Sequence, residues 1–277
     1  MNNGAKKPVH GRTRRRLKDK VAIVVGGGRG IGEAIALRFA IEGARVVLAA
    51  RSASELNRVA TQIKAANGRA HVHVTDVTDR LQVNHLVEVS LEAFGRIDVL
   101  VNAAGSYGPI GPLWEVDPEE WVNAFSVNVF SAFLLCQAVL PHMIRTRRGK
   151  IVHFSGGGAT APLPRFTAYG VSKGALVRLT ETLAEEVREY NIQINAIAPG
   201  AVDTKLQDQV LAAGARGGIF IIGCAACGRQ AKVQPRAISR LNWRCFFARR
   251  IPAASPANSS PHPLTTGNPG TSAASTR

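Results

Sequence analysis

A tyrosine and a lysine four residues apart, Tyr169 and Lys173, are the side chains in this sequence best suited to acid–base chemistry. They fall in a stretch, 167–189, whose apolar spacing predicts a helix, so both side chains lie on one helix face. A free tyrosine has a pKa of about 10, and a neighbouring ammonium favours the phenolate and lowers that pKa. Tyr169 could therefore give a proton at neutral pH to an oxygen that gains negative charge.

A run of glycines near the N-terminus could hold a phosphate group. Gly26, Gly30 and Gly32 follow the apolar run Val21–Val25 and lead into a predicted helix, 33–41. Glycines at such a turn let the backbone approach a pyrophosphate, and the start of the helix offers free N–H groups to it. The strand before and the helix after favour a nucleotide site over glycines that only make a turn.

The rest of the chain must position these groups, and its body alternates short apolar runs with amphipathic segments. Continuous β-branched runs are typical of strands that are buried on both faces. The alternation predicts an α/β fold: a Rossmann-like doubly wound parallel sheet with helices on both faces. In such sheets ligands bind beyond the carboxyl ends of the strands, so the residues after each strand are site candidates. The predicted strands are 21–25, 45–50, 71–75, 97–101, 150–154 and 192–198, and the predicted helices are 33–41, 55–66, 79–95, 119–144 and 167–189.

The motifs after these strands resemble the short-chain dehydrogenase/reductase family, over residues 17–211. They are a Gly-x-x-x-Gly-x-Gly turn, Asp76-Val77, Asn102-Ala103-Ala104-Gly105, Tyr169-x-x-x-Lys173, and Pro199-Gly200 with Val202 and Thr204. The resemblance implies an oxidoreductase that transfers a hydride between a nicotinamide cofactor and a small-molecule carbonyl or secondary alcohol, with Tyr169 as general acid/base. The expected cofactor-binding residues are Gly26, Arg29, Gly30, Ile31, Gly32, Arg51, Asp76, Val77, Asn102, Ala103, Gly105, Tyr169, Lys173, Pro199, Gly200, Val202 and Thr204.

The end of the second predicted strand indicates which nicotinamide cofactor is preferred. Enzymes that use NAD place an acid there to accept from the ribose 2′-OH. Here the strand ends in alanine and Arg51, and Arg29 stands in the glycine turn. Both arginines could pair with a 2′-phosphate, which predicts NADP(H) in preference to NAD(H). The alternative is that Arg29 and Arg51 are solvated surface side chains that do not contact the cofactor.

The resemblance also implies the rest of the catalytic set, with one departure. Lys173 would hold the nicotinamide ribose, and Asn128 would hold a water that links Lys173 to solvent. The family's carbonyl-orienting serine, thirteen residues before the tyrosine, falls on Gly156, and Ser155 stands one residue earlier. Because a flexible three-glycine turn follows, Ser155 could be re-aimed into the site. The predicted catalytic residues are therefore Tyr169, Lys173, Ser155 and Asn128. The alternative for Ser155 is that it only caps the end of the strand and does not contact the substrate.

The net charge of +16 lies in the two ends of the chain. Residues 1–20 carry eight Lys or Arg and one Asp, and residues 209–277 carry nine Lys or Arg and no acid. We therefore predict a basic disordered extension (1–18), a Rossmann-type NADP-binding catalytic domain (19–211) and a basic, disordered Pro/Ser/Ala-rich tail (212–277). This tail replaces the family's final helices and seventh strand, as a frameshift would, leaving the last strand without a neighbour. A makeshift strand at 218–222, after a crossover helix, could cover that edge.

Partners and location follow from the same features. The resemblance implies a homo-oligomer through helices 119–144 and 167–189. A neutral body between basic ends predicts no specific nucleic-acid partner, and no apolar run predicts a membrane span. The single body thiol fits a cytoplasmic location, and the Cys224-x-x-Cys227 spacing lacks the second half of a metal site. Two alternatives stay open: a nucleotide-binding protein without catalysis, and a nucleic-acid binder that uses its basic ends.

Overall fold

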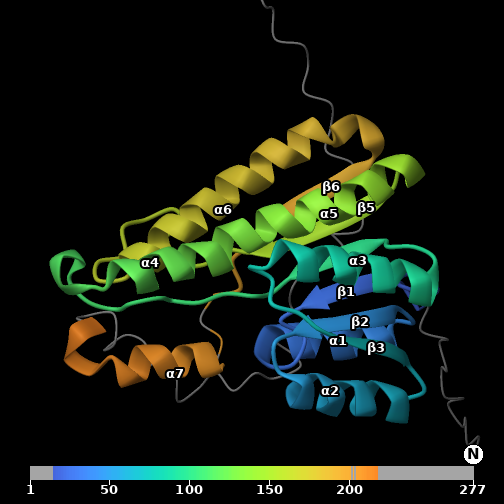
Figure 1. The fold of residues 1–277 in the computed structure, drawn as a ribbon, viewed down its shortest axis with the longest axis horizontal. Helices are drawn as coiled ribbons and strands as arrows, with labels where there is room; N and C mark the ends of the chain where they lie inside the picture. Colours follow the sequence, from blue (N-terminus) through green and yellow to red (C-terminus); the bar gives the residue numbers. More distant parts are fainter. Residues whose placement is uncertain (1–14, 201, 203, 218–277) are drawn as a thin grey trace, which may run out of the picture. The chain divides into compact units, whose positions relative to one another are not determined.

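The computed structural model describes residues 15–200, 202 and 204–217, all within the first of two units, Met1–Leu241. Six parallel strands form one sheet in the order β3-β2-β1-β4-β5-β6 (Figure 1). This confirms the predicted Rossmann-like α/β fold. The strands are β1 (Val21–Val25), β2 (Arg45–Ala50), β3 (Arg69–Val74), β4 (Val99–Asn102), β5 (Gly149–Phe154) and β6 (Ile192–Ile197).

Side-chain caps define the starts of α2, α3 and α4. The Ser52 hydroxyl accepts a hydrogen bond from the Glu55 N–H at 3.4 Å and starts α2. Asp79 caps α3 in the same way, and Gly95, at φ 74°, ends it. The helices are α1 (Gly30–Ile41), α2 (Ala53–Ala65), α3 (Arg80–Phe94), α4 (Pro118–Phe125), α5 (Ser131–Thr146), α6 (Thr167–Glu186) and α7 (Lys205–Ala212), with short 3-10 turns at Leu113–Glu115, Arg188–Tyr190 and Gly214–Gly217.

The predicted single helix 119–144 was wrong in one respect. A π-helical turn, Ser126–Phe130, separates α4 from α5. Such turns insert one extra residue into an α-helix and are frequent at functional sites. Here the turn carries Asn128, whose side chain is buried. The predicted helix 167–189 also ends earlier, at Glu186, where a short 3-10 turn follows.

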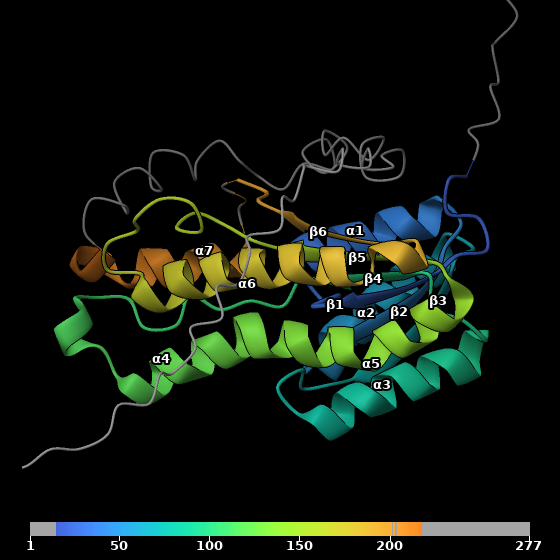
Figure 2. The same ribbon diagram turned by 90° about the horizontal axis from the view of Figure 1, so that it is seen from above.

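Helices cover both faces of the sheet, so the strands are buried on both sides. In Figures 1 and 2, α3, α5 and α6 lie over one face, and α1 and α2 lie beneath the other. Alternate residues of each strand point to opposite faces. Ile23 and Val25 join Leu135 and Met143 of α5 in one core cluster. Burial raises the pKa of the Cys136 thiol, which lies in this cluster, to about 12.

The helical stretch Pro118–Thr146 is long and apolar enough to cross a membrane by length and composition alone. A helix buried in the core of a water-soluble fold passes the same test, so this is weak support for a membrane span. The α5 part buries Leu134, Leu135, Val139 and Met143 in the core. These apolar residues therefore have a role in packing against the sheet.

The last strand, β6, pairs with β5 from residue 192 to residue 197. Among the described residues no strand pairs with its other edge. The suggested seventh strand at 218–222, like the predicted tail beyond residue 217 and residues 1–14, lies outside the described residues. The helix suggested after β6 is present as α7.

Candidate active site

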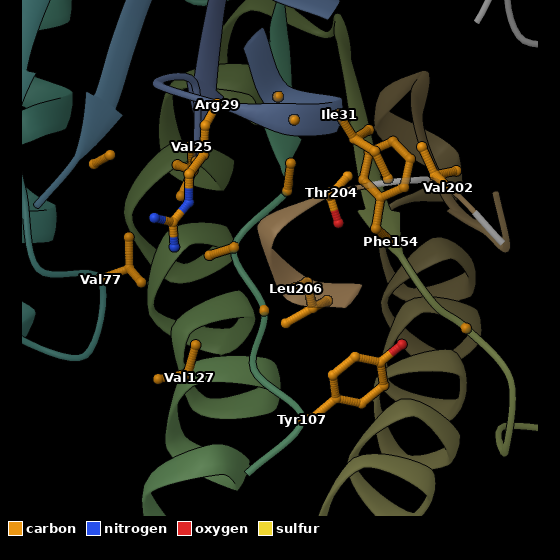
Figure 3. A pocket seen from close by; sticks show the side chains of 18 of the residues that line it. Val25, Arg29, Ile31, Val77, Tyr107, Val127, Phe154, Val202, Thr204 and Leu206 are labelled. Atoms are coloured by element: carbon orange, nitrogen blue, oxygen red, sulfur yellow. The ribbon is translucent and has the colours of Figure 1, made fainter. Parts of the chain in front are cut away.

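A cavity of about 910 Å³ opens beyond the carboxyl ends of the strands. It lies where the strand order reverses between β1 and β4, the usual ligand position in such sheets. Every predicted site residue lines it except Asn102 and Asn128. Figure 3 shows Arg29 and Val77 on one side of the cavity and Phe154 and Val202 on the other.

The glycine turn after β1 forms the floor of the cavity. Gly26 has a φ of +71°, and its N–H donates to the Ala49 carbonyl at 2.8 Å. A Cβ at Gly32 would lie 2.1 Å from the Gly26 carbonyl oxygen, so no larger residue fits there. The turn thus brings the backbone and the start of α1 to the cavity surface, as a pyrophosphate site requires.

Charged side chains gather at the end of the cavity next to β2 and β3. Thr78 donates from its N–H and its hydroxyl to one Asp76 carboxylate oxygen, at 2.9 and 2.7 Å. These hydrogen bonds, and to a lesser extent the charge of Arg51, hold the pKa of Asp76 below its usual range. Arg29 reaches the Glu55 carboxylate at 3.5 Å. The cavity therefore contains both predicted arginines and an acid from α2.

Asn102 and Asn128 shape the site from behind the cavity wall. The Asn102 Oδ1 accepts from the Ala104 N–H at 3.2 Å, which turns the chain at the end of β4. The Asn128 Oδ1 accepts from the Ser106 N–H, and its Nδ2 donates to the Ser106 carbonyl and the Ser172 hydroxyl, each at 2.8 Å. Asn128 therefore ties the loop after β4 to α6.

Tyr169 and Lys173 lie together on α6, as predicted, and both are nearly buried, with 8% and 3% of their surface exposed. The Lys173 Nζ lies 5.5 Å from the centre of the Tyr169 ring and donates to the Phe154 carbonyl at 2.7 Å. Burial lowers the pKa of Lys173 to about 8. The adjacent His153 is fully buried, and burial together with the Lys173 charge lowers its pKa to about 4.

The expected lowering of the Tyr169 pKa is not found in this structure. Burial, followed by the neighbouring Tyr107, raises the pKa of the Tyr169 phenol above its usual range. Moving the phenolate out of water into the protein interior costs more free energy than its attraction to one ammonium beside the ring recovers. Tyr169 is therefore protonated at neutral pH, which is the state that a proton donor needs.

The serine region differs from the family pattern in space as well as in sequence. A Cβ at Gly156 would lie 2.1 Å from the Tyr169 hydroxyl oxygen, so the phenol occupies the space of a side chain at that position. The hydroxyl of Ser155 is buried and has no hydrogen-bond partner among the described residues. Such an unsatisfied polar group is uncommon away from functional sites.

The sequence interpretation missed much of the apolar wall of the cavity. Tyr107 lines it and packs against Tyr169, with ring centres 4.5 Å apart. Leu163, Leu206 and Gln207 also line it, and Figure 3 shows Leu206 of α7 above Tyr107. Of residues 109–114 and 162–166, only Leu163 lines the cavity. The one available signal was that Tyr107 follows the Asn102–Gly105 motif by two residues.

Helix α7 covers part of the cavity, because its residues Leu206 and Gln207 line it. Val210 of α7 is fully buried in a cluster with Tyr107, Ile110, Phe166 and Tyr169. Within the described part of the chain, no three His, Cys, Asp or Glu side chains gather where they could hold a metal ion. The cavity thus has one charged end, and its apolar wall lies beside the buried Tyr–Lys pair.

Comparison with known proteins gives consistent matches. A model of the short chain dehydrogenase family matches residues 20–214. The 3-oxoacyl-(acyl-carrier-protein) reductase of Thermotoga maritima is 36% identical over 195 residues, which cover 70% of this chain and 79% of the relative. The crystal structure of NAD+-bound xylitol dehydrogenase has a TM-score of 0.70 at 31% identity, covering 81% of this chain and 83% of that one. A metagenomic short-chain oxidoreductase in complex with NADP has a TM-score of 0.64 at 39% identity, covering 67% and 84%.

Proposed function

Because the chain belongs to the short-chain dehydrogenase family and is an oxidoreductase of the CH–OH/C=O type, we propose that it is an NADP(H)-dependent carbonyl reductase. The observation that carries the proposal is the buried Tyr169–Lys173 pair at the wall of a cavity whose other end holds Arg29 and Arg51. The relatives include an NAD+-bound and an NADP-bound structure. The preference for NADP(H) therefore rests on the two arginines of this chain.

The residues around the cavity fit a dinucleotide. The glycine turn would carry the pyrophosphate, Asp76 and Val77 the adenine, and Arg29 and Arg51 the 2′-phosphate. Ala103, Gly105 and the residues after β6 would line the nicotinamide end. When bound, a reduced nicotinamide supplies the hydride of the reaction. The further cofactor residues of the proposal, all lining the cavity except Asn102, are Gly26, Gly30, Ile31, Gly32, Asn102, Pro199, Gly200, Val202 and Thr204.

Tyr169 gives the proton in the proposed reaction. Its phenol is neutral at pH 7 because burial raises its pKa. As a substrate carbonyl is reduced, its oxygen gains negative charge and becomes a far stronger base than a phenolate, so the Tyr169 proton moves to that oxygen. The Lys173 ammonium then lies near the new phenolate and stabilises it. Asn128 supports both residues by fixing α6 to the loop after β4.

Ser155 orients the substrate carbonyl in this proposal. Its buried hydroxyl has no hydrogen-bond partner among the described residues and lines the cavity beside Tyr169. A carbonyl oxygen that entered the site would offer the missing acceptor. The apolar wall made by Tyr107, Leu163 and Leu206 favours substrates with an apolar body next to the carbonyl.

Apolar side chains on the surface of the helices around the site support a homo-oligomer. Val122, Phe130, Phe133 and Val171 are each at least 42% exposed, and the Phe130 and Phe133 rings are stacked. They lie on α4, the π-helical turn, α5 and α6, the helices expected to pair. A change of Phe133 to Glu should reduce the particle mass in light scattering after gel filtration.

Turnover tests the proposed function directly. The full chain is incubated with NADPH and a panel of aliphatic, cyclic and aromatic ketones, and the absorbance of NADPH is followed. Loss of NADPH that depends on ketone and disappears in the variant Tyr169→Phe supports the proposal. Binding of NADPH without turnover of any ketone would instead support a nucleotide-binding protein without catalysis.

A further inference from the structure

An acid that belongs to α2 stands inside the charged end of the cavity. Glu55 lines the cavity together with Arg29, Arg51 and Ser52. Its Oε1 lies 3.5 Å from an Arg29 guanidinium nitrogen. A Cβ at Gly28 would lie 2.9 Å from the Glu55 Cβ, so this side chain is pressed against the glycine turn. The N-cap at Ser52 holds it there, because the Ser52 hydroxyl accepts from the Glu55 N–H.

A neighbouring arginine on α2 is already fully engaged. Arg58 donates to both carboxylate oxygens of Glu33, at 2.7 and 2.8 Å, and to the Gly28 carbonyl at 3.0 Å. By contrast, the Arg29–Glu55 contact is a single long one, and the Arg29 side chain is 58% exposed. Arg29 is therefore the arginine that can change partner at little cost.

Two anions cannot share Arg29 without repelling each other. A 2′-phosphate brings about two negative charges to the end of β2. If it pairs with Arg29, the Glu55 carboxylate is left close to it, and the like charges oppose binding. A cofactor that carries only a 2′-hydroxyl does not meet this repulsion, and its hydroxyl could even donate to a carboxylate.

We propose that Glu55 limits the discrimination between NADP(H) and NAD(H), because it competes with the 2′-phosphate for Arg29. The proposal rests on the proposed function, since it takes Arg29 as a ligand of the 2′-phosphate. As a consequence, the ratio of NADP(H) affinity to NAD(H) affinity is smaller than Arg29 and Arg51 alone would give. Removing the negative charge at residue 55 should therefore strengthen binding of 2′-phosphorylated nucleotides alone.

The test is a calorimetric titration of the full chain with 2′,5′-ADP and with 5′-AMP, which differ only in the 2′-phosphate. The variant Glu55→Gln keeps the shape of the side chain and removes its charge. We expect 2′,5′-ADP to bind about 5-fold tighter to it at low salt, as for loss of one exposed ion-pair competitor, and 5′-AMP to bind as before. The gain should shrink as salt is added.

Two further variants separate the proposed competition from other effects of charge. The control Glu181→Gln removes an acid that pairs with Arg178 at 2.9 Å on α6 and does not line the cavity, so it should change neither affinity. The double variant Arg29→Met/Glu55→Gln should show a clearly smaller gain over Arg29→Met than Glu55→Gln shows over the unchanged chain. Without Arg29 the competition for its guanidinium is gone, and only the direct repulsion between Glu55 and the phosphate is relieved.

The outcomes distinguish failure of the proposed cofactor assignment from failure of the proposal about Glu55. If neither nucleotide binds the unchanged chain, the cofactor assignment fails and the proposal about Glu55 fails with it. If both bind but Glu55→Gln leaves the ratio of their affinities unchanged or lowers it, only the proposal about Glu55 is overturned. A gain that is equally large with and without Arg29 would also overturn it.

Discussion

The ends of β1, β2 and β3, here the cofactor half, differ from the ends of β4, β5 and β6, here the substrate half. In the cofactor half, the turns have little freedom: a Cβ at Gly32 would meet backbone at 2.1 Å, and Asp76 is held by two hydrogen bonds from Thr78. In the substrate half, the Ser155 hydroxyl has no hydrogen-bond partner in the part of the chain that the structure describes, and Gly156 leaves space that Tyr169 fills.

This difference indicates that the cofactor half is constrained and that the substrate half can vary. Phosphate and ribose groups are the same in every reaction of one cofactor, so the backbone that meets them can be rigid. Substrates vary, and the groups that meet them lie on loops and on α7. Changes in the two halves should therefore have separable effects, on cofactor affinity in one and on turnover in the other.

The largest expected effect is in the substrate half. The variant Tyr169→Phe removes the proton donor and keeps the ring that packs against Tyr107, so kcat should fall about 1,000-fold. NADPH affinity, measured by fluorescence titration, should change by less than about threefold, because the ring stays in place and only one hydroxyl is lost. A Tyr169→Phe variant with near-normal kcat would show that another group gives the proton.

The next largest effect is in the cofactor half. In Gly32→Ala the new methyl group meets the Gly26 carbonyl, so the turn must open and NADPH affinity should fall about 100-fold, the effect of a strained backbone contact worth 2–3 kcal/mol. The matched control is Gly157→Ala, where a Cβ has nothing within 4 Å. Equal losses of NADPH affinity in both variants would contradict the rigid character assigned to the cofactor half.

A smaller effect is expected at Ser155. If its hydroxyl orients the substrate carbonyl, Ser155→Ala should lower kcat/KM about 10-fold, the value of one hydrogen bond made in the transition state. The control is Ser90→Ala on α3, a buried serine whose hydroxyl donates to the Leu86 carbonyl at 2.6 Å. Unchanged kcat/KM in Ser155→Ala would mean that Ser155 only ends β5 and that the substrate half lacks a carbonyl-orienting hydroxyl there.

The smallest effect is one of pH. Burial lowers the pKa of Lys173 to about 8, so its ammonium is complete at pH 6 and is lost as the pH rises through that value. Ketone reduction should therefore fall by about half at pH 8. NADPH affinity should respond less, because the charged end of the cavity relies on arginines, which stay protonated. A reduction rate that stays flat to pH 9.5 would contradict this role of Lys173.

Most of the fold could be predicted from the sequence because buried parallel strands are continuous apolar runs between helices. The observed helix ends differ from the predicted ones by a few residues. The cap at Ser52 explains why α2 starts at residue 53, before the predicted residue 55. The π-helical turn at Asn128 leaves no periodic signal, since one inserted residue hardly changes the apolar pattern. It depends on hydrogen bonds to Ser106 and Ser172, which are distant in sequence.

Most residues that line the cavity beside β1, β2 and β3 could also be predicted from the sequence, because glycines and charges at strand ends follow from local geometry. In the substrate half, Tyr169, Lys173 and Ser155 were predicted, but the apolar wall of the cavity was not. Tyr107, Leu206 and Gln207 reach the cavity only through the path of loops and of α7, which no local pattern determines. The raised pKa of Tyr169 likewise depends on burial and on Tyr107, both properties of the folded molecule.

The most direct test of the account is a thermal-shift titration of the purified full chain with NADPH and, separately, with NADH. A ligand that binds only the folded state raises the melting temperature according to its concentration and affinity. The account predicts one cooperative transition that both cofactors shift upward, NADPH at lower concentration than NADH. A transition that neither cofactor shifts, or one that only NADH shifts, would contradict the assignment of the charged end of the cavity to a 2′-phosphate.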